Sequence, residues 1–183
     1  RWGLKDAGLD LPHMPATGVS GLDLYVKGDD GKWRWVANGR PTKYPINTST
    51  LVNAIPAASR EYLVYFPLYN GVKKVEIGIP ESSKITKAPA YPKNTRKPLL
   101  FYGTSITQGG VASRPGMAYT NQVSRRLADG RFVYNFGFSG NGEMEIDVMQ
   151  YLVTIPAAVF VIDCNWNMDA DLISQRIVPL VQY

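Results

Sequence analysis

The sequence predicts a partial antiparallel β-sandwich followed by an incomplete α/β domain with a parallel sheet. In residues 1–80, short segments alternate apolar and polar positions without a helical period, as in antiparallel sheets. From residue 98 onward, strand-like and helix-like segments alternate, which is typical of parallel sheets. Residues 81–97 between them are rich in Pro, Ser and Lys and show little periodicity. We therefore expect a domain at 1–80, a linker at 81–97 and a second domain at 98–183.

Composition places the chain among ordinary globular proteins. Its 183 residues are 45% hydrophobic and 19% charged, and no apolar run reaches the roughly 18 residues of a membrane helix. The net charge is +5, but Lys and Arg are scattered, so we expect no nucleic-acid partner. The single cysteine, Cys164, excludes an internal disulfide, and the single histidine, His13, excludes a multi-His metal site.

The first domain reads as four strands. Residues 22–26 and 33–37 alternate apolar and polar positions around an Asp-Asp-Gly-Lys turn, which predicts a hairpin. A third strand is expected at 61–68 and a fourth at 72–80, separated by a Tyr-Asn-Gly turn. Residues 1–2 resemble the end of a strand, so we expect opening strands to be missing.

Alternating aromatic residues lie on two of these strands, namely Trp33, Trp35, Tyr62 and Tyr65. Such a set can form a sugar-stacking face, but packing in the core is the more common use of aromatic side chains. We expect core packing, and the sugar-binding alternative stays open.

The second domain reads as three strands and three helices. Compact apolar segments predict the strands, and the longer segments after them predict the helices, the first of which is closed by Asp129-Gly130. The expected strands are 98–102, 132–136 and 157–162, and the expected helices are 118–128, 143–152 and 169–181.

A polar loop follows each predicted strand of this second domain. Ligands bind beyond the carboxyl ends of parallel strands, so these loops are the place to look for chemistry. Residues 103–110 put Ser105 between a strand and a helix, where a nucleophile would be exposed near backbone N–H groups. Residues 135–142 are glycine-rich, and residues 162–168 carry asparagines that can donate to an oxyanion. Plain turns, or an Asn that caps the next helix, would give each pattern alone.

Together, these loops resemble the SGNH/GDSL hydrolase superfamily of serine esterases, whose sheet is flavodoxin-like. Residues 103–107, Gly-Thr-Ser-Ile-Thr, look like its first block, although Thr104 stands where Asp is common. Residues 139–141, Ser-Gly-Asn, look like the second block. Asn167 looks like the third-block Asn, although Met168 replaces the usual Asp.

The resemblance implies a serine esterase mechanism. Ser105 would be the nucleophile, and Gly140 and Asn167 would complete the oxyanion hole, with no metal or organic cofactor. Residues 21–25, Gly-Leu-Asp-Leu-Tyr, are similar to the Gly-x-Asp-Leu-Tyr motif of a β-sandwich domain that precedes one bacterial SGNH subgroup. That pairing resembles carbohydrate esterases that remove acetyl groups. It implies an acylated small molecule or polysaccharide as substrate, and a periplasmic or secreted protein.

The superfamily carries its general base in a late Asp-x-x-His block, and no histidine follows His13 here. With three strands visible where a flavodoxin-like sheet has five, we expect truncation at both ends. We interpret His13 as a loop histidine, because a base needs hydrogen-bond reach to Ser105. We interpret Cys164 as a small buried residue. The alternatives to an esterase are a carbohydrate-binding module and a catalytically inactive interaction domain; a lipase is the weaker reading.

Overall fold

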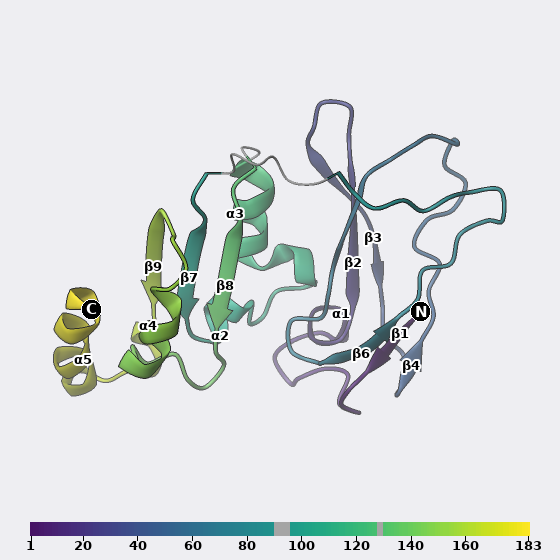
Figure 1. Cartoon of the computed structure of the whole chain (residues 1–183). Helices are drawn as coiled ribbons and strands as arrows, with labels where there is room; N and C mark the ends of the chain where they lie inside the picture. Colours follow the sequence, from purple (N-terminus) through teal and green to yellow (C-terminus); the bar gives the residue numbers. More distant parts are fainter. Residues whose placement is uncertain (90–95, 128–129) are drawn as a thin grey trace. The chain divides into compact units, whose positions relative to one another are not determined.

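A computed structural model describes residues 1–89, 96–127 and 130–183, and it divides the chain into two compact units (Figure 1). The first unit is Arg1–Tyr91 together with Val111–Met117, and the second is Pro92–Gly110 together with Ala118–Tyr183. Part of the predicted linker 81–97 lies outside the described residues, and the predicted domain boundaries stay predictions.

The first unit contains two three-stranded antiparallel sheets, ordered β4-β1-β6 and β3-β2-β5. Their core holds Trp2, Leu4 and Leu22, and Val64 and Val75 pack against it, so strands of both sheets contribute side chains. The β-sandwich assignment itself stays a prediction. The elements are β1 (Trp2–Leu4), α1 (Ala16–Val19), β2 (Leu22–Lys27), β3 (Trp33–Gly39), β4 (Ile46–Asn47), β5 (Tyr62–Tyr65), β6 (Val72–Val75) and the short 3-10 helix η1 (Pro115–Met117).

The predicted β2–β3 hairpin is present, with a turn fixed by its own residues. Gly31 has φ +76°, a backbone angle that suits glycine, and Asp30 accepts from the Lys32 N–H at 3.1 Å. Asp30 also pairs with both terminal nitrogens of Arg34, at 2.8 and 2.9 Å. The strands expected at 61–68 and 72–80 are confirmed in part, because β5 and β6 are each four residues long.

Two aromatic side chains of these strands do not pack in the core as predicted. Trp35 is 52% exposed and Tyr62 is 42% exposed. The reason for Trp35 is a register shift in the β2–β3 pairing, after which Trp35 stands opposite Tyr25. A bulge of this kind turns a side chain to the other face of its strand. The Trp35 indole therefore lies on the face of Asp23 and Tyr25, where its Nε1 donates to Asp23 at 2.7 Å.

The second unit is built around a parallel sheet ordered β8-β7-β9, as the strand and helix alternation predicts (Figure 1). Each predicted strand and helix is present within a few residues; residue 128 of the helix expected at 118–128 lies outside the described residues. The elements are β7 (Leu99–Gly103), α2 (Ser105–Gln108), α3 (Tyr119–Leu127), β8 (Val133–Gly137), α4 (Ile146–Leu152), β9 (Val159–Asp163), the 3-10 helix η2 (Asn165–Asn167) and α5 (Ala170–Gln182).

Helices pack on both faces of this sheet. Side chains along a strand point alternately to the two faces, so neighbouring residues of β7 contact different helices. Leu100 and Tyr102 of β7 are fully buried in a core that includes Met149 of α4 and Leu180 of α5. Phe101 lies between them in the sequence, and its ring packs edge-on against the ring of Tyr119 in α3, with 5.6 Å between the ring centres. A sheet covered in this way leaves the carboxyl ends of its strands as the place for a site.

Candidate active site

Ser105 is the first residue of α2, and Thr104 alone separates it from the end of β7. Thr104 caps the helix, since its Oγ1 accepts from the Ile106 N–H at 3.3 Å, and it is fully buried. The Ser105 carbonyl accepts from the N–H groups of Gly109 and Gly110, at 3.1 and 2.7 Å. These bonds close a single tight helical turn that carries the half-buried Ser105 side chain.

A polar network beneath this turn ties α2 to its neighbours. The buried Thr107 hydroxyl lies 2.8 Å from the Tyr119 hydroxyl and donates to Asp163 at 3.2 Å. Asn135 donates to the Thr107 carbonyl at 2.6 Å and to Thr120 Oγ1 at 2.8 Å. Burial raises the pKa of Tyr119, which keeps its hydroxyl protonated. This network fixes the helical turn of Ser105 against α3, β8 and β9.

The glycine-rich loop after β8 lies directly against the end of β7. The Phe138 N–H donates to the Gly103 carbonyl at 2.9 Å, and the Ser139 N–H donates to Gln108 Oε1 at 2.9 Å. Gly140 and Gly142 both have φ +72°, the left-handed region that favours glycine. The glycine-rich loop is therefore held against the end of β7 by one backbone hydrogen bond and against α2 by one bond to the Gln108 side chain.

The loop after β9 joins the same edge of the sheet. Asn167 ends η2, and its side-chain amide donates to the carbonyl of Asn141 in the glycine-rich loop. Gly103, the last residue of β7, pairs in register with Gly137 of β8 and Asp163 of β9. The structure therefore places the loops of all three predicted site residues at one edge, and their catalytic roles stay predictions.

The two other chemically reactive side chains have separate surroundings. His13 is exposed in a turn of the first unit, between Leu11 and Met14, whose backbone groups exchange two hydrogen bonds of 3.0 Å. Its interpretation as a loop histidine fits this position. Cys164 is fully buried, as predicted, and burial raises the pKa of its thiol to about 11. A thiol with such a pKa is a poor nucleophile at neutral pH.

A buried tyrosine fixes the far end of the glycine-rich loop. The Tyr102 hydroxyl of β7 bonds to the Glu145 carboxylate, which also accepts from the Glu143 N–H at 2.7 Å. Burial and the adjacent Glu145 carboxylate raise the pKa of Tyr102. Burial also acts to raise the pKa of Glu145, but its hydrogen bonds outweigh that effect and leave this pKa below its ordinary 4.5. The pair therefore consists of a neutral phenol and a carboxylate at neutral pH.

Tyr102→Phe is expected to lower the free energy of unfolding by about 1–2 kcal/mol at pH 7, since it removes a bond to a charged acceptor. Because the folded pKa of Glu145 is lowered, its carboxylate stabilises the fold above pH 4.5, and this contribution is lost as the pH falls through the folded pKa. The difference between the variant and the parent should therefore shrink below about pH 4.5.

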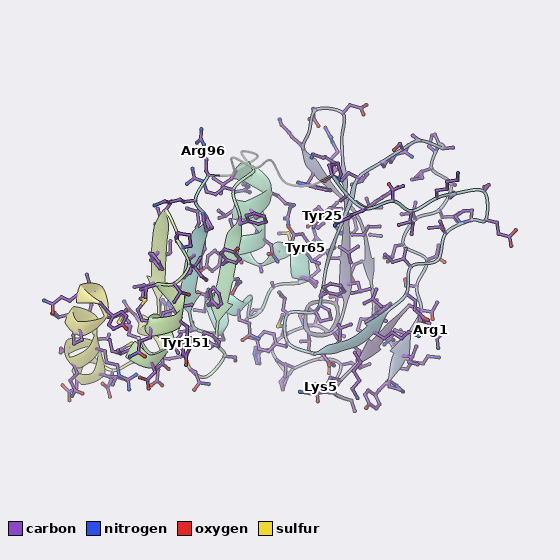
Figure 2. All side chains as sticks on the ribbon, viewed as in Figure 1. Arg1, Lys5, Tyr25, Tyr65, Arg96 and Tyr151 are labelled. Carbon is purple, nitrogen blue, oxygen red and sulfur yellow. The ribbon has the colours of Figure 1, made fainter. Side chains whose placement is uncertain are left out.

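Urea unfolding measures this difference at pH 7 and at about three or four pH values between roughly 3.5 and 5. Tyr151→Phe is the matched control, because Tyr151 is 76% exposed and its side chain points outward from α4 (Figure 2). The control should change the unfolding midpoint little at any pH. If Tyr102→Phe lowers the free energy of unfolding by the same amount at pH 7 and at about pH 3.5, Glu145 is not the charged partner of Tyr102.

Within residues 1–89, 96–127 and 130–183, no three His, Cys, Asp or Glu side chains gather where a metal ion could be held. In the same ranges, no helix combines the length and the apolar character needed to cross a membrane.

Sequence reasoning missed the network around Thr107. In the sequence, Tyr119 looks like an ordinary residue at the start of a helix, and Asp163 looks like an ordinary loop residue. One signal was available: Asn135 interrupts the otherwise apolar segment 132–136. A polar side chain within an apolar strand can mark a point where a neighbouring element is anchored by hydrogen bonds, as Asn135 anchors Thr107 and Thr120.

Comparison with known proteins agrees with this arrangement. Residues 96–183 match the model of the GDSL-like lipase/acylhydrolase family, and residues 1–85 match the GxDLY model, described as the N-terminus of the SGNH-hydrolase type of esterase. No curated protein matches the chain. A crystal structure of a protein described as a GDSL-like lipase from Bacteroides ovatus is 37% identical, with a TM-score of 0.88.

That similarity covers 99% of this chain and 51% of the Bacteroides chain, so the sequence spans about half the length of that relative. The two family models fall on the two halves in which the corresponding motifs were found. The resemblance inferred from the sequence is therefore confirmed. Each half of the chain thus matches a family model of the SGNH/GDSL hydrolases: the C-terminal half matches the GDSL-like lipase/acylhydrolase family, and the N-terminal half matches the GxDLY family.

Proposed function

We propose that this protein is a serine esterase that removes acyl groups, above all acetyl groups, from carbohydrates. The observation that carries the proposal is the joining of three loops at one sheet edge. The turn of Ser105 is tied to the glycine-rich loop through Phe138 and Gly103, and that loop is tied to Asn167 through Asn141. A nucleophile and candidate oxyanion donors on rigid, mutually bonded loops are what acyl transfer requires.

In the proposed reaction, Ser105 Oγ forms a bond to the ester carbonyl carbon while a base takes its proton. The N–H groups of Ser105 and Gly140 and the side-chain amide of Asn167 hold the resulting oxyanion. Asn167 has two amide protons, so one can stay on the Asn141 carbonyl while the other serves the oxyanion. Collapse breaks the bond to the sugar oxygen, which receives the proton, and water then releases the acid from Ser105.

The proposal assigns the proton transfer to a histidine of the Asp-x-x-His type that the resemblance implies. His13, the one histidine of the sequence, lies in the exposed turn of the first unit instead. The substrate class rests on the pairing of a GxDLY domain with a GDSL-like domain, which resembles carbohydrate esterases. An acylated polysaccharide would place the protein in the periplasm or outside the cell, and this compartment is part of the proposal.

Substrate preference tests the proposal directly. We expect the protein, as its gene encodes it, to release acetate from acetylated xylan. We also expect kcat/KM for p-nitrophenyl acetate to exceed that for p-nitrophenyl octanoate by at least about tenfold, because a site shaped for a small acyl group excludes longer ones. Chemically deacetylated xylan is the control and should release nothing. A preference for octanoate would replace the acetylesterase proposal with a lipase-like one.

The half-exposed indole of Trp35 favours a second candidate, a carbohydrate-binding module. Exposed aromatic rings offer a face on which sugars stack. One face of this ring is already occupied, because the Arg114 guanidinium lies 4.9 Å from its centre. The esterase proposal therefore remains the better supported of the two.

A further inference from the structure

Residues 111–117 follow the Ser105 turn in the sequence, yet they belong to the first unit of the fold. The Thr17 hydroxyl of α1 donates to the Ser113 carbonyl at 2.6 Å. Gly18 approaches this segment so closely that a Cβ there would lie 2.2 Å from the Ala112 carbonyl oxygen. The segment is thus packed against α1 by backbone contacts that no larger residue at position 18 would allow.

A buried carboxylate provides the strongest attachment. Asp23 is fully buried, and its Oδ1 accepts from Trp35 Nε1 at 2.7 Å. Its Oδ2 accepts from the Gly116 N–H at 2.9 Å and lies 3.2 Å from Arg114 Nε. Removing a charged group from water is costly unless it is paired and hydrogen-bonded, so the fold depends on these donors being present. We refer to Asp23, Tyr25, Trp35, Arg114 and Gly116 as the Asp23 cluster.

The tyrosine of the same motif completes the enclosure of Gly116. A Cβ at Gly116 would lie 2.4 Å from the Tyr25 hydroxyl oxygen and 2.5 Å from Asp23 Oδ2. Tyr25 itself is buried and meets Tyr65 edge-on at 5.6 Å, which fixes its ring (Figure 2). Asp23 and Tyr25 stand two residues apart on one strand and therefore face the same side. The Asp and Tyr of the Gly-x-Asp-Leu-Tyr motif thus both act on one backbone position of 111–117.

The point where the chain enters this segment is strained. Val111 has φ +64°, an angle at which a β-branched residue is a clear outlier. Its neighbour Gly110 donates to the Ser105 carbonyl at 2.7 Å, so the strained residue directly follows the turn of the nucleophile. Strain of this kind persists where the surrounding structure holds the backbone on both sides. The Asp23 cluster holds one side and the Ser105 turn forms the other.

We infer that the Asp23 cluster positions the Ser105 turn through residues 111–117, which makes Asp23 and Tyr25 positioning residues for the nucleophile. This inference rests on the proposed function, since it concerns the same serine. It gives the Gly-x-Asp-Leu-Tyr motif a role in the reaction without contact to substrate. Loss of the cluster frees one end of the turn and should misplace Ser105 Oγ relative to the ester carbonyl.

Two variants test the inference in the protein as its gene encodes it. Asp23→Asn removes the charge that Arg114 and Gly116 share, and Gly116→Ala forces the segment away from Tyr25. Each should lower kcat for p-nitrophenyl acetate at least about tenfold with KM changed less than about twofold, because small misplacements of a nucleophile affect the chemical step. Active sites are counted from the burst of p-nitrophenol, so that unfolded protein does not enter kcat. Amide exchange of residues 106–118 should speed at least about tenfold.

Asp30→Asn is the matched control, because it removes an Asp–Arg pair from the exposed turn of the same hairpin. It should change neither kcat nor the exchange of residues 106–118. If Asp23→Asn does not fold, Trp35→Phe removes a single donor from the cluster at a half-exposed site and takes its place. If the Asp23→Asn and Gly116→Ala variants keep the kcat of the parent, or the amide exchange rates of the parent in residues 106–118, the inference is overturned. A parent protein without esterase activity would overturn the proposed function instead, and the inference with it.

Discussion

Ser105→Ala is expected to lower kcat for p-nitrophenyl acetate by a factor on the order of 10⁴–10⁶, as in other serine hydrolases that lose their nucleophile. The variant keeps the backbone N–H groups and the polar contacts of Thr107, so substrate binding and folding should survive. The loss should therefore appear in kcat with little change in KM or in the urea midpoint. A fluorophosphonate should add its mass to the parent protein at Ser105 and not to the variant.

Ser174→Ala is the matched control. Ser174 is an exposed serine of α5 whose hydroxyl donates to the Ala170 carbonyl, and its loss should leave kcat unchanged. Asn167→Ala gives a graded arm, with an expected loss of about 10²–10³ in kcat for one oxyanion donor. Equal activity of the Ser105→Ala variant and the parent would exclude the serine mechanism. Retained xylan binding with no hydrolysis in the parent would favour the carbohydrate-binding alternative.

Local patterns in the sequence were sufficient for the second unit. Each strand of its sheet is a largely apolar run, so β7, β8 and β9 can be predicted without knowledge of their partners. The position of the predicted site followed from a general rule, that parallel strands bring their carboxyl ends to one edge. Ser105, Gly140 and Asn167 could be placed on three loops for that reason.

Pairings between distant segments had no comparable signal. β1 is a three-residue strand, yet it is the central strand of its sheet, with β4 and β6 as neighbours. Such a short segment shows no alternation, and its strand character comes from Asn47 and Val75 opposite Trp2. The exposure of Trp35 was missed for a related reason, because the bulge that turns it depends on the register between β2 and β3.

The membership of residues 111–117 in the first unit is the least predictable feature of the fold. In the sequence, this segment is a short connection between the Ser105 turn and α3, and nothing in it indicates a partner near residue 23. Its attachment depends on the small volume of Gly116 and on the carboxylate of Asp23, which lies 93 residues earlier in the sequence. Contacts at such separation are invisible to any rule based on local periodicity.

Gly142→Ala is expected to destabilise the fold far more than Gly140→Ala, although both glycines have φ +72°. At Gly140, a Cβ meets nothing within 4 Å, so alanine adds only the cost of the left-handed conformation, about 1 kcal/mol. At Gly142, a Cβ would also lie 2.2 Å from the Gly103 carbonyl oxygen. Overpacking of this kind typically adds about 1–3 kcal/mol.

The colliding oxygen cannot move easily, because Gly103 ends β7 and its carbonyl already accepts from the Phe138 N–H. Relief would require the glycine-rich loop to withdraw from the strand that leads into Ser105. Urea unfolding of the two variants and the parent therefore measures how tightly the first two loops are joined, with the left-handed cost cancelled between the variants. Equal midpoints for Gly142→Ala and Gly140→Ala would show that the loop stands away from β7. A Gly142→Ala midpoint well below that of Gly140→Ala would establish the close approach on which the oxyanion geometry depends.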